Sequence, residues 1–191
     1  MEKDARIFAD RQKSLEEQFF ARQSEELKRK LREEREKEEM REELRRIAVV
    51  TDEHTIDRMI ELGIGADTWA AISLVPLVEV AWANGSVDEK EHGAVLAAAE
   101  ANGVVPGSPS HQILARWLDH RPDPRLLTAW GEYIVELCAA LSPEEKQGLK
   151  DELLARARAV AEASGGFLGL GNKTSSDERE ILDELAKAFA R

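Results

Sequence analysis

The first 47 residues combine a very high density of charge with a complete absence of helix-breaking residues. They hold 14 basic and 14 acidic residues, so more than half of the positions are charged and their net charge is zero. Neither glycine nor proline occurs between Lys3 and Ile47. The segment is instead rich in good helix formers, and such a density of charge leaves too few apolar residues for a core. One long projecting N-terminal helix is therefore predicted.

Charge pairing at helical spacing supports this prediction. Residues four apart face each other on a helix, and an opposite pair adds a few tenths of a kcal/mol. Such pairs occur at Glu25/Arg29, Glu26/Lys30, Glu33/Lys37 and Glu42/Arg46.

Apolar residues in this segment follow the helical period over only part of its length. Phe20, Ser24, Leu27 and Leu31 follow a 4–3–4 spacing, but glutamates occupy the next two positions and the pattern resumes out of phase at Met40. Three readings stay open: a solitary solvated helix, a short coiled coil or a helix that docks on a partner. The adjacent aromatic residues Phe19 and Phe20 favour docking. The residues assigned to this contact are Phe8, Leu15, Phe19, Phe20, Leu27 and Leu31.

The remaining 144 residues carry the entire net charge of −11. A surface this acidic repels the phosphate backbone, so a nucleic-acid partner is not expected. Cations or basic protein surfaces are the natural ligands of such a domain.

Cysteine usage and hydropathy point to a cytoplasmic protein. Cys138 is the single cysteine, which excludes an intrachain disulfide and fits a reducing compartment. The N-terminus lacks the apolar core of a signal peptide. The most apolar stretch, Thr68 to Ala83, is too short for a membrane span and contains Pro76 and Glu79, so no transmembrane segment is predicted.

Residues that begin or end helices occur often after residue 47, and their spacing predicts a compact all-α domain of six or seven helices. Asp52 or Thr55 can open a short helix that ends at Leu62, and further helices are expected after Asp88, Ser108-Pro109, Asp123-Pro124, Ser142-Pro143 and Ser175. No segment alternates apolar and polar residues, so no sheet is predicted. The expected organisation is a charged helix over 1–47, a short helix and connector over 48–65, and the bundle over 66–191.

One predicted helix, over residues 67–83, is apolar nearly all round. A helix without a polar face is normally enclosed by others, so this one is expected at the centre of the bundle. Pro76 lies in its middle and is expected to kink it.

Two segments of the bundle read alike. In each, an apolar helix ends in a small polar residue and glycine, at Asn84-Gly85 and at Ser164-Gly165, and a capping box opens the next helix. The repeated unit is thus a tight helix–turn–helix, and two such units can pack about a pseudo-twofold axis.

The first unit resembles the signature of the TerB-like family of tellurite-resistance-associated helical domains. The matching residues are Ala83-Asn84-Gly85-Ser86-Val87-Asp88, followed by Glu91, and the resemblance covers residues 66–190. It implies a compact all-helical bundle and, in some members, cation binding by acidic side chains. In this chain Asn84 and Ser164 stand where the family has aspartate before the glycine.

The candidate metal ligands are Asp88, Glu91, Ser175 and Glu178, which are equally the residues of the two capping boxes. Cys138 lies on an apolar stripe and is interpreted as a core residue. The four histidines form no i, i+4 pair, so neither zinc ligation nor a catalytic residue is predicted. Phe167 and Leu168, within a glycine-rich loop, either tuck into the core or bind a partner.

These observations predict a non-enzymatic protein-interaction or scaffolding module without a cofactor. Its N-terminal helix would supply self-association or partner docking, and the family resemblance suggests a stress or tellurite-resistance pathway. The alternative function is a divalent-cation-binding sensor built on the four capping residues.

Overall fold

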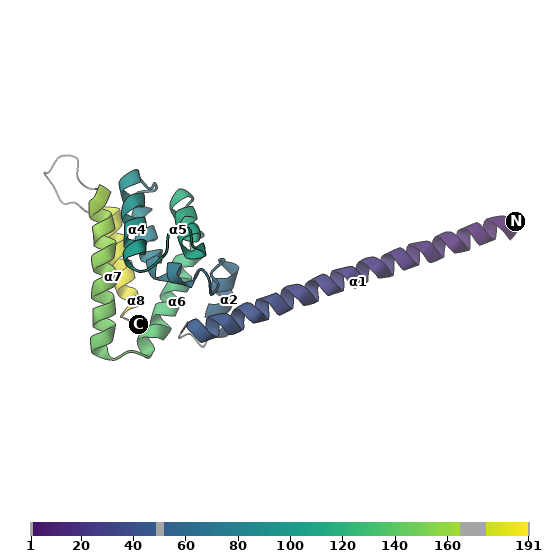
Figure 1. The fold of residues 1–191 in the computed structure, drawn as a ribbon, viewed down its shortest axis with the longest axis horizontal. Helices are drawn as coiled ribbons and strands as arrows, with labels where there is room; N and C mark the ends of the chain where they lie inside the picture. The colour runs from purple at the N-terminus through teal and green to yellow at the C-terminus, as the bar shows by residue number, and fades with distance from the viewer. Residues whose placement is uncertain (1, 49–51, 165–174, 191) are drawn as a thin grey trace. The chain divides into compact units, whose positions relative to one another are not determined.

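The chain folds into helices throughout the part that the structure describes. The computed structural model covers residues 2–48, 52–164 and 175–190, with side chains from Phe19 onward except at Ala21 and Ser164. These residues form eight α-helices and one 3-10 helix, and no strand occurs among them (Figure 1). The chain divides into two compact units, residues 1–40 and 41–191. The predicted all-α class is therefore confirmed, with seven α-helices following the long one.

Helix α1 spans Glu2–Ile47 without a break, as its composition predicts. Its exposed charges pair along the helix: Lys30 lies 3.4 Å from Glu26, and Arg29 lies 3.7 Å from Glu33 rather than pairing with Glu25. Each exposed pair contributes little on its own. Continuity therefore rests mainly on the helix propensity of the whole segment.

The last two turns of α1 belong to the second compact unit. Leu44 is fully buried and forms a small core with Ala48 and Ile56 of α2 (Glu53–Glu61). The Arg41 guanidinium donates two hydrogen bonds, of 2.7 and 2.9 Å, to the Asp57 carboxylate. The border between the units thus lies inside α1, at residue 40, whereas the amino-acid composition changes after residue 47.

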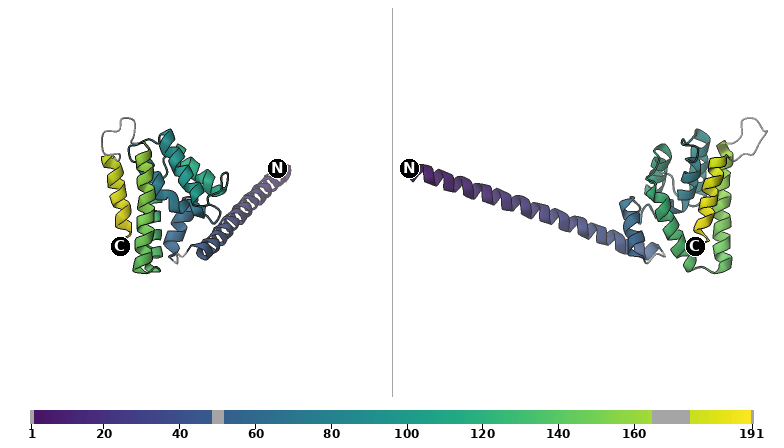
Figure 2. Two further views of the ribbon diagram at one scale, coloured as in Figure 1. Left: turned by 60° about the vertical axis from the view of Figure 1, so that its left-hand side comes forward. Right: turned by 180° about the vertical axis from the view of Figure 1, so that it is seen from behind.

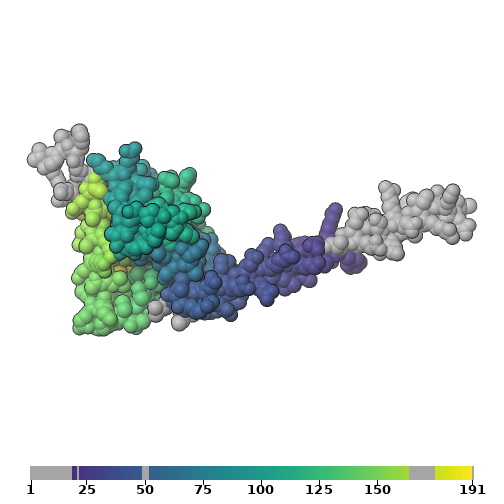
Figure 3. All heavy atoms as spheres, in the orientation of Figure 1, coloured from purple at the N-terminus to yellow at the C-terminus, as the bar shows by residue number. Residues whose placement is uncertain are grey.

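The rest of the second unit is a bundle around one short helix, α3. Its other elements are η1 (Trp69–Leu74), α3 (Val75–Ala81), α4 (Glu89–Ala101), α5 (Pro109–Asp119), α6 (Arg125–Ala139), α7 (Pro143–Ser164) and α8 (Ser176–Ala188). Helix α3 packs against η1 and all five later helices, and six of its seven residues are buried. The predicted central position is confirmed. In the space-filling view, α4, α5 and α7 form much of the near surface of this unit (Figure 3).

The apolar stretch predicted as one helix over 67–83 is in fact two elements. A 3-10 helix, η1, ends at Leu74, and α3 starts at Val75 with Pro76 in its first turn. Proline is well tolerated there, because the first N–H groups of a helix have no intrahelical acceptor. The expected kink is therefore wrong: Pro76 starts a helix instead of bending one.

Helix caps lie where the sequence predicts them. The Asp52 carboxylate accepts the Thr55 N–H at 2.8 Å, and Ser142 and Glu145 exchange capping-box hydrogen bonds of 2.8 and 3.3 Å. Gly85, which follows α3, has a φ of +93°, a conformation that other residues adopt only with strain. Among the described helices, none has both the length and the apolar character needed to cross a bilayer.

The two similar segments form hairpins that pack on each other. Helix α3 leads into α4, and α7 leads into α8; Figures 1 and 2 show α7 and α8 side by side. Across the two hairpins, α3 packs on α7, α4 on α7 and α3 on α8. Exchange of α3 with α7 and α4 with α8 reproduces this set of contacts, as a pseudo-twofold arrangement requires.

The burial of Leu44 predicts that the end of α1 stabilises the bundle. We expect Leu44→Ala to lower the free energy of unfolding by about 2–5 kcal/mol, since it leaves a cavity in a packed site. Leu27→Ala, at an exposed position of the same helix, should change it by less than about 0.5 kcal/mol. Urea denaturation of the full chain measures both values. Equal effects would show that Leu44 does not anchor α1.

Candidate functional site

The four predicted metal ligands serve as helix caps. The Asp88 carboxylate accepts the N–H groups of Lys90 and Glu91, both at 2.8 Å, and Glu91 accepts the Asp88 N–H at 2.9 Å. At α8, Ser175 and Glu178 form the same reciprocal box. Both glutamates are buried, at 1% and 3% exposure. A cation at either place would compete with these cap bonds.

Among the residues that the structure describes, neither box forms part of a group of three candidate metal ligands. Among the described residues, no group of three or more histidine, cysteine, aspartate or glutamate side chains is arranged to hold a metal ion. The divalent-cation-sensor function stays a prediction, and no contact among the described residues supports it.

Cys138 is a core residue, as its place on an apolar stripe predicts. It is 8% exposed, and burial raises the pKa of its thiol, which favours the unreactive protonated form. His92 lies 3.6 Å from Asp119, and His54 contacts the Arg58 guanidinium at 2.7 Å. None of these contacts involves the cysteine.

The stripe predicted for partner binding is exposed over its described part. The exposed fractions are 56% for Phe19, 64% for Phe20, 60% for Leu27 and 56% for Leu31. The two phenyl rings meet edge to face, with centroids 5.9 Å apart. The side chains of Phe8 and Leu15, and the whole of Phe167 and Leu168, lie outside the described residues.

Two lysines flank this stripe. At about 100° per residue, Lys28 and Lys30 fall about 80° to either side of the line through Phe20, Leu27 and Leu31. Charges of both signs fall about 120° or more away from that line, whereas Glu34, just beyond the stripe, falls about 40° from it. The residues on the far side are Arg22, Glu25, Glu26, Arg29, Arg32 and Glu33. The stripe and its two lysines, from Phe20 to Leu31, are called the basic face of α1 below.

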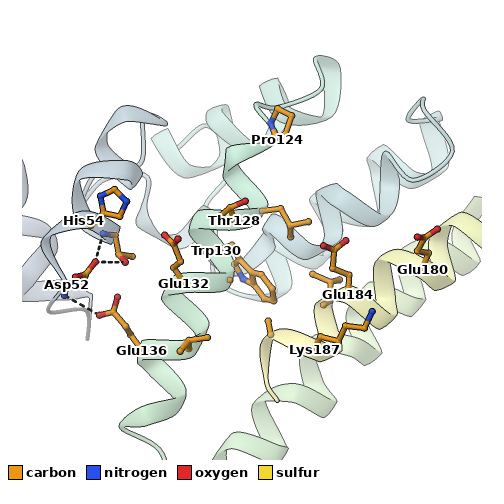
Figure 4. A pocket seen from close by; sticks show the side chains of 16 residues that line it. Asp52, His54, Pro124, Thr128, Trp130, Glu132, Glu136, Glu180, Glu184 and Lys187 are labelled. Carbon is orange, nitrogen blue, oxygen red and sulfur yellow. Dashed lines mark hydrogen bonds between the residues drawn. The ribbon is translucent and has the colours of Figure 1, made fainter. Parts of the chain in front are cut away.

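A concave surface of the bundle lies over α6, between α2 and α8. It has a volume of about 1040 Å³, and its lining residues come from these three helices and their caps (Figure 4). The apolar part of the lining includes Leu127, Trp130, Val135, Leu185 and Ala188. Trp130 is 1% exposed, and Figure 4 shows its indole between α6 and α8. We call this surface the α6 groove.

The rim of the α6 groove is strongly acidic. Five carboxylates line it, against one lysine, Lys187: they belong to Asp52, Glu132, Glu136, Glu180 and Glu184. Figure 4 shows the glutamates of α6 on the side of α2 and those of α8 on the opposite side. A groove with an apolar base and carboxylates on both edges suits an amphipathic segment that carries basic residues.

Part of this rim is held in place by hydrogen bonds. Glu132 accepts a hydrogen bond of 2.5 Å from Arg58, and Glu136 accepts the Asp52 N–H at 3.3 Å. The second carboxylate oxygen of Glu132 and the indole Nε1 of Trp130 are buried and make no hydrogen bond within the described residues. A buried polar atom without a partner costs about 1–3 kcal/mol, so these two atoms lower the stability of the folded state.

The sequence analysis did not identify the α6 groove, although a signal for it exists. Glu132 and Glu136 on α6, like Glu180 and Glu184 on α8, are glutamates four residues apart. Like charges at this spacing face each other and destabilise a helix by a few tenths of a kcal/mol. Two such pairs facing one concave surface indicate a cationic ligand, but only the fold shows that they share that surface.

Comparison with known proteins gave no match: no family model, curated protein or solved structure is similar to this chain. The resemblance to the TerB-like family therefore stays a prediction, resting on the residues from Ala83 to Glu91.

The acidic rim acts on one half-buried carboxyl of the central helix. Glu79 is the single charged residue of α3, and its pKa is raised, first by burial and further by the negative charge of Glu184. The positive charge of Arg121 opposes this shift without cancelling it. An ionised Glu79 is therefore less favourable in the folded protein than in the unfolded chain.

This shift predicts a pH-dependent loss of stability. The folded state binds the Glu79 proton more tightly than the unfolded chain, so the stabilisation is present below the ordinary pKa of 4.5 and is lost as pH rises through the folded-state pKa. Glu79→Gln should therefore melt at a higher temperature than the wild type at pH 7, and the difference should shrink toward pH 4.5. Glu100→Gln, at an exposed site on α4, is the control. Equal behaviour of the two variants in thermal melts would contradict the assignment.

Proposed function

We propose that this protein is a non-enzymatic protein-interaction module, in which the basic face of α1 docks on a partner surface. The proposal rests on one observation. The three large apolar side chains of this face, those of Phe20, Leu27 and Leu31, are more than half exposed on a helix that is otherwise rich in charge. A contact that buries them recovers about 25 cal/mol for each square ångström removed from water.

A regular two-stranded coiled coil explains this face poorly. The 4–3–4 spacing assigns the next two core positions to Glu34 and Glu38, which would bring carboxylates together at the seam. In a parallel homodimer, Lys30 of one helix would face Arg35 of the other, which is a like-charge pair. Of the readings left open by the sequence, docking on a differently charged surface is therefore favoured.

A solitary solvated helix is also less consistent with these residues. Charge pairs such as Lys28 with Glu25, at 3.0 Å, can maintain a helix without aromatic side chains. Two adjacent phenylalanines and two leucines add nothing to such pairing, and they form a local apolar surface of the kind that marks interaction sites.

The proposal predicts that polar residues in the stripe abolish binding without unfolding the bundle. Leu27→Gln/Leu31→Gln keeps good helix formers in α1 while removing its apolar side chains. We expect the full-length variant to lose self-association in sedimentation velocity, or to lose partners retained by the wild type in affinity purification with mass spectrometry.

Arg29→Gln/Glu33→Gln is the matched control, because it alters two exposed positions on the opposite face and leaves the net charge unchanged. It should behave as the wild type in both measurements. If the leucine variant also matches the wild type in mass and in retained proteins, the proposed function is wrong.

A further inference from the structure

We propose that the basic face of α1 docks into the α6 groove of a second copy of this chain. This inference rests on the proposed function and names its partner. The two surfaces belong to different compact units, and each has the chemistry that the other lacks.

The basic face of α1 is short. From Phe20 to Leu31 it extends over about 16 Å at 1.5 Å per residue. Its centre is apolar, and Lys28 and Lys30 stand on its two sides. The α6 groove has the complementary pattern, with an apolar base along α6 and α8 and carboxylates on both edges. A helix lying along α6 would place one lysine toward each acidic edge.

Relief of electrostatic repulsion between glutamates of the groove supports this pairing. On α8, Glu180 and Glu184 repel each other, and a lysine near them would reduce that repulsion; on α6, Glu132 already accepts a hydrogen bond from Arg58, so the gain there is smaller. The lysines give up little in exchange. Their present partners, Glu25 at 3.0 Å and Glu26 at 3.4 Å, are exposed residues of the same helix, and exposed pairs contribute about 0–1 kcal/mol.

The predicted contact is weak and salt-sensitive. A single short helix face buries less than the roughly 1,200 Å² of a standard stable interface, so a dissociation constant in the micromolar range is expected. The rim charges are exposed in part, so association should weaken as salt rises.

Charge reversal with complementation tests the pairing on the full chain. One variant, Glu180→Lys/Glu184→Lys, reverses the α8 edge of the groove; two others, Lys28→Glu and Lys30→Glu, each reverse one flank of α1. Sedimentation equilibrium over a range of about 5–200 µM brackets a micromolar constant. Each variant alone should self-associate about tenfold or more weakly than the wild type. An equimolar mixture of the groove variant with one of the two flank variants should recover association, because the reversed flank then meets the reversed α8 edge while the remaining lysine still meets the α6 edge.

Glu100→Lys/Glu162→Lys is the control for net charge, since both residues are exposed and neither lines the groove. It should associate as the wild type does, and circular dichroism should show that all variants remain folded. Association by the groove variant at the wild-type level would overturn the inference. If the leucine variant described above still abolishes association in that case, the basic face binds another surface and the proposed function survives.

Two further outcomes also overturn the second-copy assignment. A wild-type chain that is monomeric at every concentration excludes docking on a second copy. This holds even if α1 of the same molecule occupies the groove. Failure of both mixtures to recover association shows that the two sets of charges do not meet.

Discussion

The architecture depends on the burial of α3, a short helix with almost no polar face. Six of its seven residues are buried, and the single charged one, Glu79, has a raised pKa because it is partly removed from water. Such a helix is stable only when others enclose it. Helices α4 to α8 and η1 all pack against it, so the order and spacing of the later helices follow from the need to cover one apolar segment.

The fold explains why the apolar pattern of α1 changes phase after Leu31. Leu44 packs into the bundle, although Met40 and Ile47 of the same pattern are exposed, whereas Leu27 and Leu31 belong to a stripe out of phase with it and are exposed. The glutamates between the two patterns, Glu34 and Glu38, separate an intramolecular contact from the proposed intermolecular one. One continuous helix thereby carries both an anchor and a docking face.

Local features of the fold could be predicted from the sequence, and features that depend on packing could not. Caps such as Asp88 with Glu91 are local, since a few consecutive residues determine their hydrogen bonds, and they form as predicted. The structural effect of Pro76 could not be predicted, because proline occurs both at helix kinks and in the first turn of a helix. Only the end of the preceding 3-10 helix at Leu74 decides between the two. The α6 groove could not be predicted from the sequence, because the helices that line it, α2, α6 and α8, are far apart along the chain. The acidic pairs on α6 and α8 could have been noticed in sequence, but not their common surface.

Hydrogen–deuterium exchange of the full chain at low and high protein concentration measures the central claim most directly, because it reports on both surfaces at once. The account predicts that raising the concentration slows exchange in α1 between residues 19 and 31, and also slows it in the segments of α6 and α8 that line the groove. Slowing in α1 alone, or no change in either place, would contradict it.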